Sequence, residues 1–101
     1  MYIYNVTIKI DISIEQEWLR WMQEEHLKEV IATGMFDSYS FLELLEPNEE
    51  GSKTFIAQYY TDSIARYETY IEAFAPNLRQ KGMDKFGNQF IAFRTILKKH
   101  I

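Results

Sequence analysis

Some segments of the chain repeat their apolar residues with the period of a strand and others with the period of a helix. The order of these segments is the strongest constraint on the fold. Four segments alternate their side chains between two faces or are rich in β-branched and aromatic residues, which is typical of β-strands. They are 2–10, 36–45, 53–61 and 90–97. Segment 14–32 instead spaces its apolar residues as a helix does, and a second helical segment runs from about 63 to 74. The chain is therefore predicted to form strand, helix, strand, strand, helix, strand.

The two helical segments have recognisable ends. The first is predicted to stop at Thr33-Gly34, where glycine supplies a left-handed C-terminal residue. Pro76 predicts a break after the second helix, followed by a short third helical piece over 77–86. A helical wheel of 100° per residue predicts the buried face of the first helix. Its members are Ile14, Trp18, Leu19, Met22, His26 and Val30.

This order of elements predicts an α+β fold of the ferredoxin-like type, a βαββαβ sandwich with a four-stranded antiparallel sheet. The chain has 101 residues, which is the size of one domain, and we assign the whole range 1–101 to it. Both βαβ crossovers are expected to be right-handed, so the two helices should cover the same face of the sheet. The other face should be open.

The open sheet face is not predicted to be polar, because it would carry Ile3 and large side chains from the other strands. Aromatic residues make up 16% of the chain, more than a thin layer of one sheet and two helices readily hides. Exposed apolar surface of this kind marks an interface or a ligand groove. The sequence therefore predicts a homodimer that packs through the open sheet face.

Composition narrows the function classes. The chain has no cysteine, so disulfides and thiolate metal sites are impossible. A net charge of −4 argues against a nucleic-acid binder, which needs clustered lysine and arginine. No stretch has the length and apolarity of a membrane span, and the alternating N-terminus is not typical of a signal peptide. We expect a cytoplasmic protein, with no nucleic-acid or membrane partner, no cofactor and no metal.

Read over nearly its full length, the chain resembles a bacterial family of short proteins known only as a domain of unknown function. The resemblance rests on the opening MYIYNVT, on EWLRWMQEEHLKEVIATGMF (17–36) and on APNLRQKGMDKFGNQFIAFRTIL (75–97). It implies a ferredoxin-like domain of the dimeric α/β-barrel group, which includes cofactor-free monooxygenases, haem-degrading enzymes, muconolactone isomerase-like proteins and ligand-sensing domains. A fold shared by so many chemistries does not select one of them.

His26 is the candidate catalytic residue. It falls on the apolar face of the first helix, which would line a cavity between helix and sheet in a dimeric α/β barrel. There it could act as a general base beside a flat aromatic ligand. The alternative is a neutral histidine at the edge of the core, hydrogen-bonded to the backbone or to a glutamate.

Five further residues are candidates for ligand binding: Trp18, Met22, Tyr4, Tyr59 and Arg94. Trp18 could stack on a planar ligand, although aromatic residues at helical spacing are more often core. Arg94, if buried, needs an anionic partner, which could be a ligand carboxylate or a glutamate across the sheet. Tyr4 and Tyr59 offer hydroxyl groups in or near the sheet.

Two functions remain open. The first is a small-molecule-binding dimer or a cofactor-free enzyme that uses the cavity between the first helix and the sheet. The second is a non-catalytic module for self-association or protein docking. A cavity of roughly 300 Å³ or more, lined by His26 and Trp18, would favour the first, and a filled core at that place would favour the second.

Overall fold

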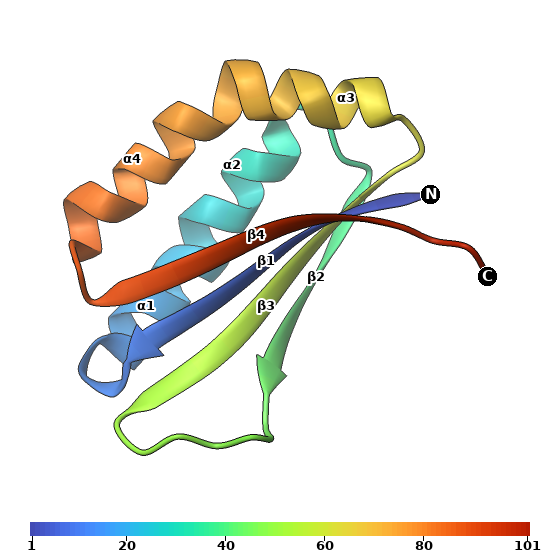
Figure 1. Cartoon of the computed structure of the whole chain (residues 1–101). Helices are drawn as coiled ribbons and strands as arrows, with labels where there is room; N and C mark the ends of the chain where they lie inside the picture. Colours follow the sequence, from blue (N-terminus) through green and yellow to red (C-terminus); the bar gives the residue numbers. More distant parts are fainter.

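The four predicted strands form one antiparallel sheet in the computed structural model, which describes residues 1–101. The strands are β1 (Tyr2–Asp11), β2 (Ser38–Leu44), β3 (Ser52–Thr61) and β4 (Phe90–Lys98). Their spatial order is β2-β3-β1-β4, with β1 and β3 in the centre. Both helical segments lie on one face of this sheet (Figure 1). The predicted βαββαβ architecture is therefore confirmed.

Each of the two helical segments is one continuous helix that contains a π-helical turn. Helix one starts with a 3₁₀ turn, η1 (Ile12–Ile14), and continues through α1 (Glu15–Trp21), the π turn η2 (Met22–His26) and α2 (Leu27–Ala32). Helix two consists of α3 (Ile64–Thr69), the π turn η3 (Tyr70–Phe74) and α4 (Ala75–Phe86). Ser63 caps helix two by accepting a hydrogen bond from the Arg66 N–H. π turns are rare and concentrate at functional sites.

The predicted break at Pro76 is wrong, and 77–86 is not a separate helix. Proline lacks an N–H, and its ring conflicts with the carbonyl four residues earlier in an α-helix. The π turn η3 ends at Phe74, two residues before Pro76, and the Ala75 N–H donates to the Tyr70 carbonyl five residues back. This wider turn lets helix two continue through the proline.

The predicted buried face of helix one is correct only in part. Ile14, Trp18, Met22 and Val30 are buried as expected. Leu19 and His26 are only partly buried, whereas Leu27 and Trp21 are buried. The π turn η2 closes with a bond between residues five apart, so the wheel of 100° per residue fails at its end, at His26 and Leu27. Leu27 consequently takes the core position that the wheel gives to His26.

The core lies between the helices and the sheet, and aromatic rings dominate it. Tyr4 on β1 lies at its centre, with its ring 5.9 Å from the rings of both Phe36 and Tyr59 and 5.6 Å from that of Tyr70. Aromatic pairs at these separations contribute beyond their buried area. The strand residues that face the helices are thus fixed in place by helix two and by the segment before β2.

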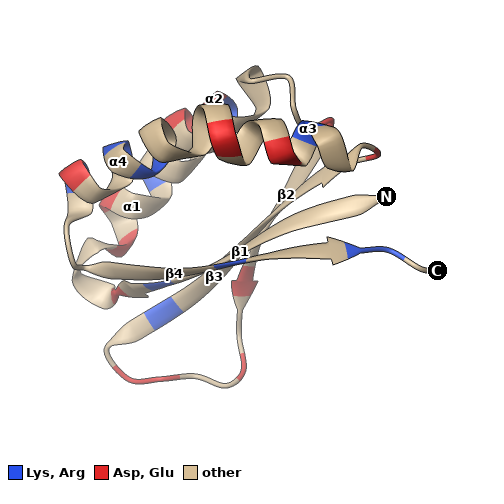
Figure 2. Cartoon of the chain, turned by 45° about the horizontal axis from the view of Figure 1, so that its top comes forward, with Lys and Arg blue, Asp and Glu red and all other residues tan.

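The open sheet face is apolar along both edges and polar across its middle. Ile91, Phe93 and Leu97 on β4 are 42–61% exposed, and Leu42 on β2 is 46% exposed. Between these edges a row of Thr95, Asn5, Gln58 and Ser40 crosses the four strands. Figure 2 shows that most charged residues belong to the helices and the β2–β3 loop, while few belong to the strands.

Three members of the polar row, Asn5, Gln58 and Ser40, form side-chain hydrogen bonds on this face. The Gln58 Nε2 donates to the Asn5 Oδ1 at 3.0 Å, and the Asn5 Nδ2 donates to the Thr7 Oγ1 at 3.2 Å. The Tyr60 hydroxyl donates to the Gln58 Oε1 at 3.0 Å. Polar groups that are already paired can be covered at little cost, because covering leaves few donors or acceptors without partners.

Candidate functional site

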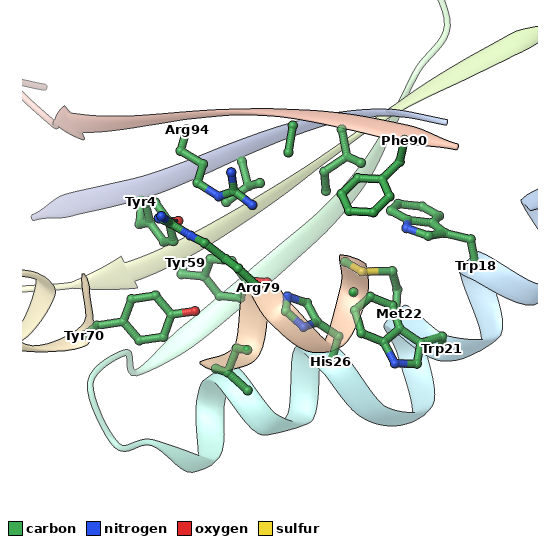
Figure 3. A pocket seen from close by; sticks show the side chains of 15 residues that line it. Tyr4, Trp18, Trp21, Met22, His26, Tyr59, Tyr70, Arg79, Phe90 and Arg94 are labelled. Carbon is green, nitrogen blue, oxygen red and sulfur yellow. Dashed lines mark hydrogen bonds between the residues drawn. The ribbon is translucent and has the colours of Figure 1, made fainter. Parts of the chain in front are cut away.

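A small cavity lies between the sheet and the two helices, and it brings all six predicted site residues together. Tyr4, Tyr59 and Arg94 reach it from the sheet, Trp18 from α1, and Met22 and His26 from the π turn η2 (Figure 3). Its volume is about 50 Å³. That is well below the roughly 300 Å³ of a typical drug-sized ligand site. The cavity can accept a small polar group but not a whole aromatic molecule.

His26 is neutral and has no hydrogen-bond partner. Its ring stacks on the Trp21 ring, with 4.8 Å between centroids and 23° between planes. Burial lowers its pKa to about 4, an effect that nearby Glu29 opposes and that Arg94 and Lys81 reinforce. The neutral state agrees with the structural alternative for His26, but the hydrogen bond to the backbone or a glutamate that this alternative expects is absent. Its role stays a prediction.

We expect the burial of His26 to make the fold sensitive to mild acid. The histidine pKa falls from 6.5 in the unfolded chain to about 4 in the fold, so the unfolded state binds a proton first as the pH drops. Stability that is complete above about pH 6.5 is therefore lost progressively toward pH 4. Between about pH 7 and pH 5 this loss should be about 1–2 kcal/mol for a half-buried ring.

The variant His26→Phe keeps a ring against Trp21 and removes the titration. Between pH 7 and pH 5, the free energy of unfolding measured in urea should fall by about 1–2 kcal/mol more for the wild type than for the variant. Equal losses in both proteins would show that His26 titrates normally.

Trp18 and Met22 are core residues that also form part of the cavity wall. Each is 2% exposed. The Trp18 ring lies 5.2 Å from the Phe55 ring and 5.9 Å from the Phe41 ring, so helix one is attached to the sheet through it.

Arg94 is exposed, so the condition under which it would need an anionic partner is not met. Its side chain lines the cavity but forms no ion pair with a glutamate or aspartate. The strand register explains why. The row across the sheet at this level runs from Arg94 through Val6 and Ala57 to Phe41 and contains no acidic residue.

Sequence reasoning missed Arg79 and Tyr70, which line the cavity from helix two. The Arg79 Nη2 donates to the Tyr4 hydroxyl at 3.1 Å, while its Nε is buried and has no partner. Burial raises the pKa of the hydroxyl groups of Tyr59 and Tyr70 and keeps both protonated. The helical spacing of Tyr70, Leu78 and Gly82 could have indicated this inner face of helix two.

Two negative findings complete the site. No group of three or more histidine, aspartate or glutamate side chains is arranged to hold a metal ion. None of the helices combines the length and apolarity needed to span a bilayer.

The fold and the cavity define a ferredoxin-like α+β protein with a small cavity between its helices and its sheet. A family model matches residues 1–100, and the chain belongs to that family, the domain of unknown function DUF4286. The resemblance predicted from the sequence is thus confirmed. No curated protein matches the chain.

Three solved structures are similar to it in fold. An ethyl tert-butyl ether degradation (EthD) family protein from Bacillus halodurans superposes with a TM-score of 0.71 at 12% identity, covering 99% of this chain and 100% of its own. A Deinococcus radiodurans protein assigned as an antibiotic biosynthesis monooxygenase gives 0.61 at 13% identity, covering 100% and 96%. A dimeric ferredoxin-like protein from an uncultured marine organism gives 0.51 at 14% identity, covering 99% and 98%. At these identities the likeness shows the fold alone.

Proposed function

We propose that this protein is a homodimer that binds a small molecule in the cavity between helix one and the sheet. The observation that carries the proposal is the convergence of both π turns on this cavity. The turn η2 contributes Met22 and His26 to its wall, and the turn η3 begins with Tyr70. π turns weaken helical hydrogen bonding and are frequent where side chains must be redirected toward a ligand.

The proposed dimer covers the open sheet face. That face exposes large apolar side chains on β4 and β2, and its polar row is already hydrogen-bonded. Packing two such faces together would bury the apolar edges without creating many unpaired polar groups. The dimeric ferredoxin-like protein of similar fold supports this assembly by analogy.

Binding is better supported than acid–base catalysis. A general base works best when its pKa lies near the working pH. His26 has a pKa of about 4, so it accepts protons weakly at neutral pH. In this proposal its neutral ring contributes shape and one acceptor nitrogen to the cavity, and catalysis by His26 would require a ligand that raises its pKa.

Filling the cavity tests the proposal. Ala92 lines the cavity from β4, so Ala92→Leu should occupy its free space. A panel of small aliphatic acids, amides and alcohols is screened by thermal shift, and a hit is then titrated by NMR. Ala92→Leu should weaken binding of that hit by roughly tenfold or more.

The matched control is Ala65→Leu, the same change at an exposed position of α3 away from the cavity. It should bind as the wild type does. Equal affinity of the hit for both variants would place its binding elsewhere and contradict the proposal.

The alternative function, a non-catalytic module for self-association or protein docking, is favoured by the small volume of the cavity. In that case the panel gives no hit, and Ala92→Leu stabilises the fold by filling space. The dimer is common to both functions, so the ligand screen is the measurement that separates them.

A further inference from the structure

Two arginine side chains meet at the cavity without any acidic partner. Arg79 comes from α4 and Arg94 from β4, on opposite sides of the space (Figure 3). Neither forms an ion pair, whereas Arg66, on the surface, pairs with Asp37. We propose that Arg79 and Arg94 hold the carboxylate of a small organic acid in this cavity, an inference that rests on the proposed function and names its ligand class.

Arg79 is the stronger of the two observations. Its Nε is buried and donates no hydrogen bond, and its only side-chain bond runs from Nη2 to the Tyr4 hydroxyl. A buried donor without a partner costs free energy, and one that belongs to a charged group costs more. Carboxylates bind strongly to guanidinium groups, and Nη2 is the only atom of the Arg79 guanidinium group that donates a side-chain hydrogen bond.

Arg94 adds a second positive charge at the same place. Both arginines lie close enough to Tyr70 to act on its hydroxyl, and Arg94 also acts on His26. Two like charges at one cavity repel each other across its apolar walls. An anion between them removes that repulsion. Arg94 lines the cavity and is also exposed, so a ligand can approach it from solvent.

The hydroxyl of Tyr4 completes the donor set. Its oxygen accepts from Arg79, which leaves its own O–H free to donate. Trp18, Met22 and Ala92 form apolar walls beside these donors. A site with positive groups at one part, apolar walls elsewhere and a volume of about 50 Å³ fits a carboxylate on a short apolar chain. It does not suit phosphate, whose several charged oxygens would meet the apolar walls.

The experiment titrates the full-length wild type with propionate, propionamide and inorganic phosphate, followed by the NMR signal of the Trp21 indole. Propionate should bind, and the uncharged, similarly shaped propionamide should bind much more weakly. The Arg79→Gln variant should lose propionate affinity by roughly 10- to 100-fold. Arg20→Gln removes the same charge from an exposed position of α1 and should bind propionate as the wild type does.

A structural role for Arg79 predicts something else. If Arg79 served the fold, Arg79→Gln would lower the melting temperature of the ligand-free protein. We expect that temperature to stay unchanged or to rise, because the variant removes an unpaired buried donor and a repulsion. A marked fall in the melting temperature with unchanged propionate affinity would overturn the inference.

Three results separate this inference from the proposed function. If Arg79→Gln and Arg20→Gln lowered the propionate affinity equally, the positive surface charge alone would attract the ligand, and the inference would be overturned. Phosphate binding tighter than propionate would overturn the carboxylate assignment. An uncharged ligand could bind tightly and be blocked by Ala92→Leu while propionate does not bind. That result would support the proposed function and reject an organic acid as its ligand. Failure of every ligand rejects both.

Discussion

Trp18→Ala is expected to lower the free energy of unfolding by about 3–5 kcal/mol, the usual cost of truncating a fully buried aromatic residue. Trp18 is 2% exposed and its ring contacts the rings of Phe41 and Phe55, so it attaches helix one to β2 and β3. Domains of this size have a total stability of about 5–15 kcal/mol. The variant should therefore unfold at a much lower urea concentration or fail to fold.

The control for this prediction is Trp18→Phe, which retains an aromatic ring against the same two neighbours. It should lose clearly less stability than the alanine variant, since less volume is removed. Urea unfolding followed by circular dichroism measures both. If Trp18→Ala lowered the free energy of unfolding by less than about 1 kcal/mol, a core role for Trp18 would be contradicted and ligand binding would become its main candidate role.

The faces of the strands could be predicted because a strand has a fixed period of two. Once Tyr4 is assigned to the inner face of β1, Ile8 and Ile10 must follow it, and all three are buried. The same alternation places Arg94 toward the helices and Phe93 on the open face. No bulge interrupts β1, β3 or β4, so the pattern holds along each strand.

The two helices could be predicted except at their π turns. A π turn inserts a residue without any strong signal in hydrophobic periodicity, so the wheel placed His26 where Leu27 packs. Pro76 did carry information, but about a wider turn before it and not about a helix end. In both helices the irregular turn lies at the cavity. Local rules of sequence fail where a functional site is expected.

The candidate site could be predicted in part for the same reason. Six residues were placed together because each faces the layer between helices and sheet. Arg79 was missed because an arginine on an amphipathic helix usually faces solvent, and its partner Tyr4 lies 75 positions away in sequence. The surroundings of Arg94 could not be predicted, because the strand register that places Val6 and Ala57 beside it cannot be read from composition.

Phe93→Asp is expected to dissociate the proposed dimer. Phe93 is 61% exposed on the open face, in a row with Thr7, Ile56 and Leu42. A two-fold interface uses the same patch on both chains, so each dimer loses two phenylalanines. Covering each ring stabilises by about 1.5–3 kcal/mol. The dissociation constant should therefore rise by roughly 10²- to 10⁴-fold.

Light scattering at micromolar concentration should give twice the chain mass for the wild type and the single chain mass for Phe93→Asp. The matched control is Met83→Asp, the same kind of charge at an apolar residue 57% exposed on α4, away from the sheet. It should remain dimeric. If only Met83→Asp dissociated the dimer, the interface would involve the helices and not the sheet. A monomeric wild type would contradict the dimer altogether. Because Phe93 is exposed in the single chain, its replacement should leave the monomer folded. A cooperative thermal unfolding transition of the variant would show that the substitution changes the assembly and not the fold.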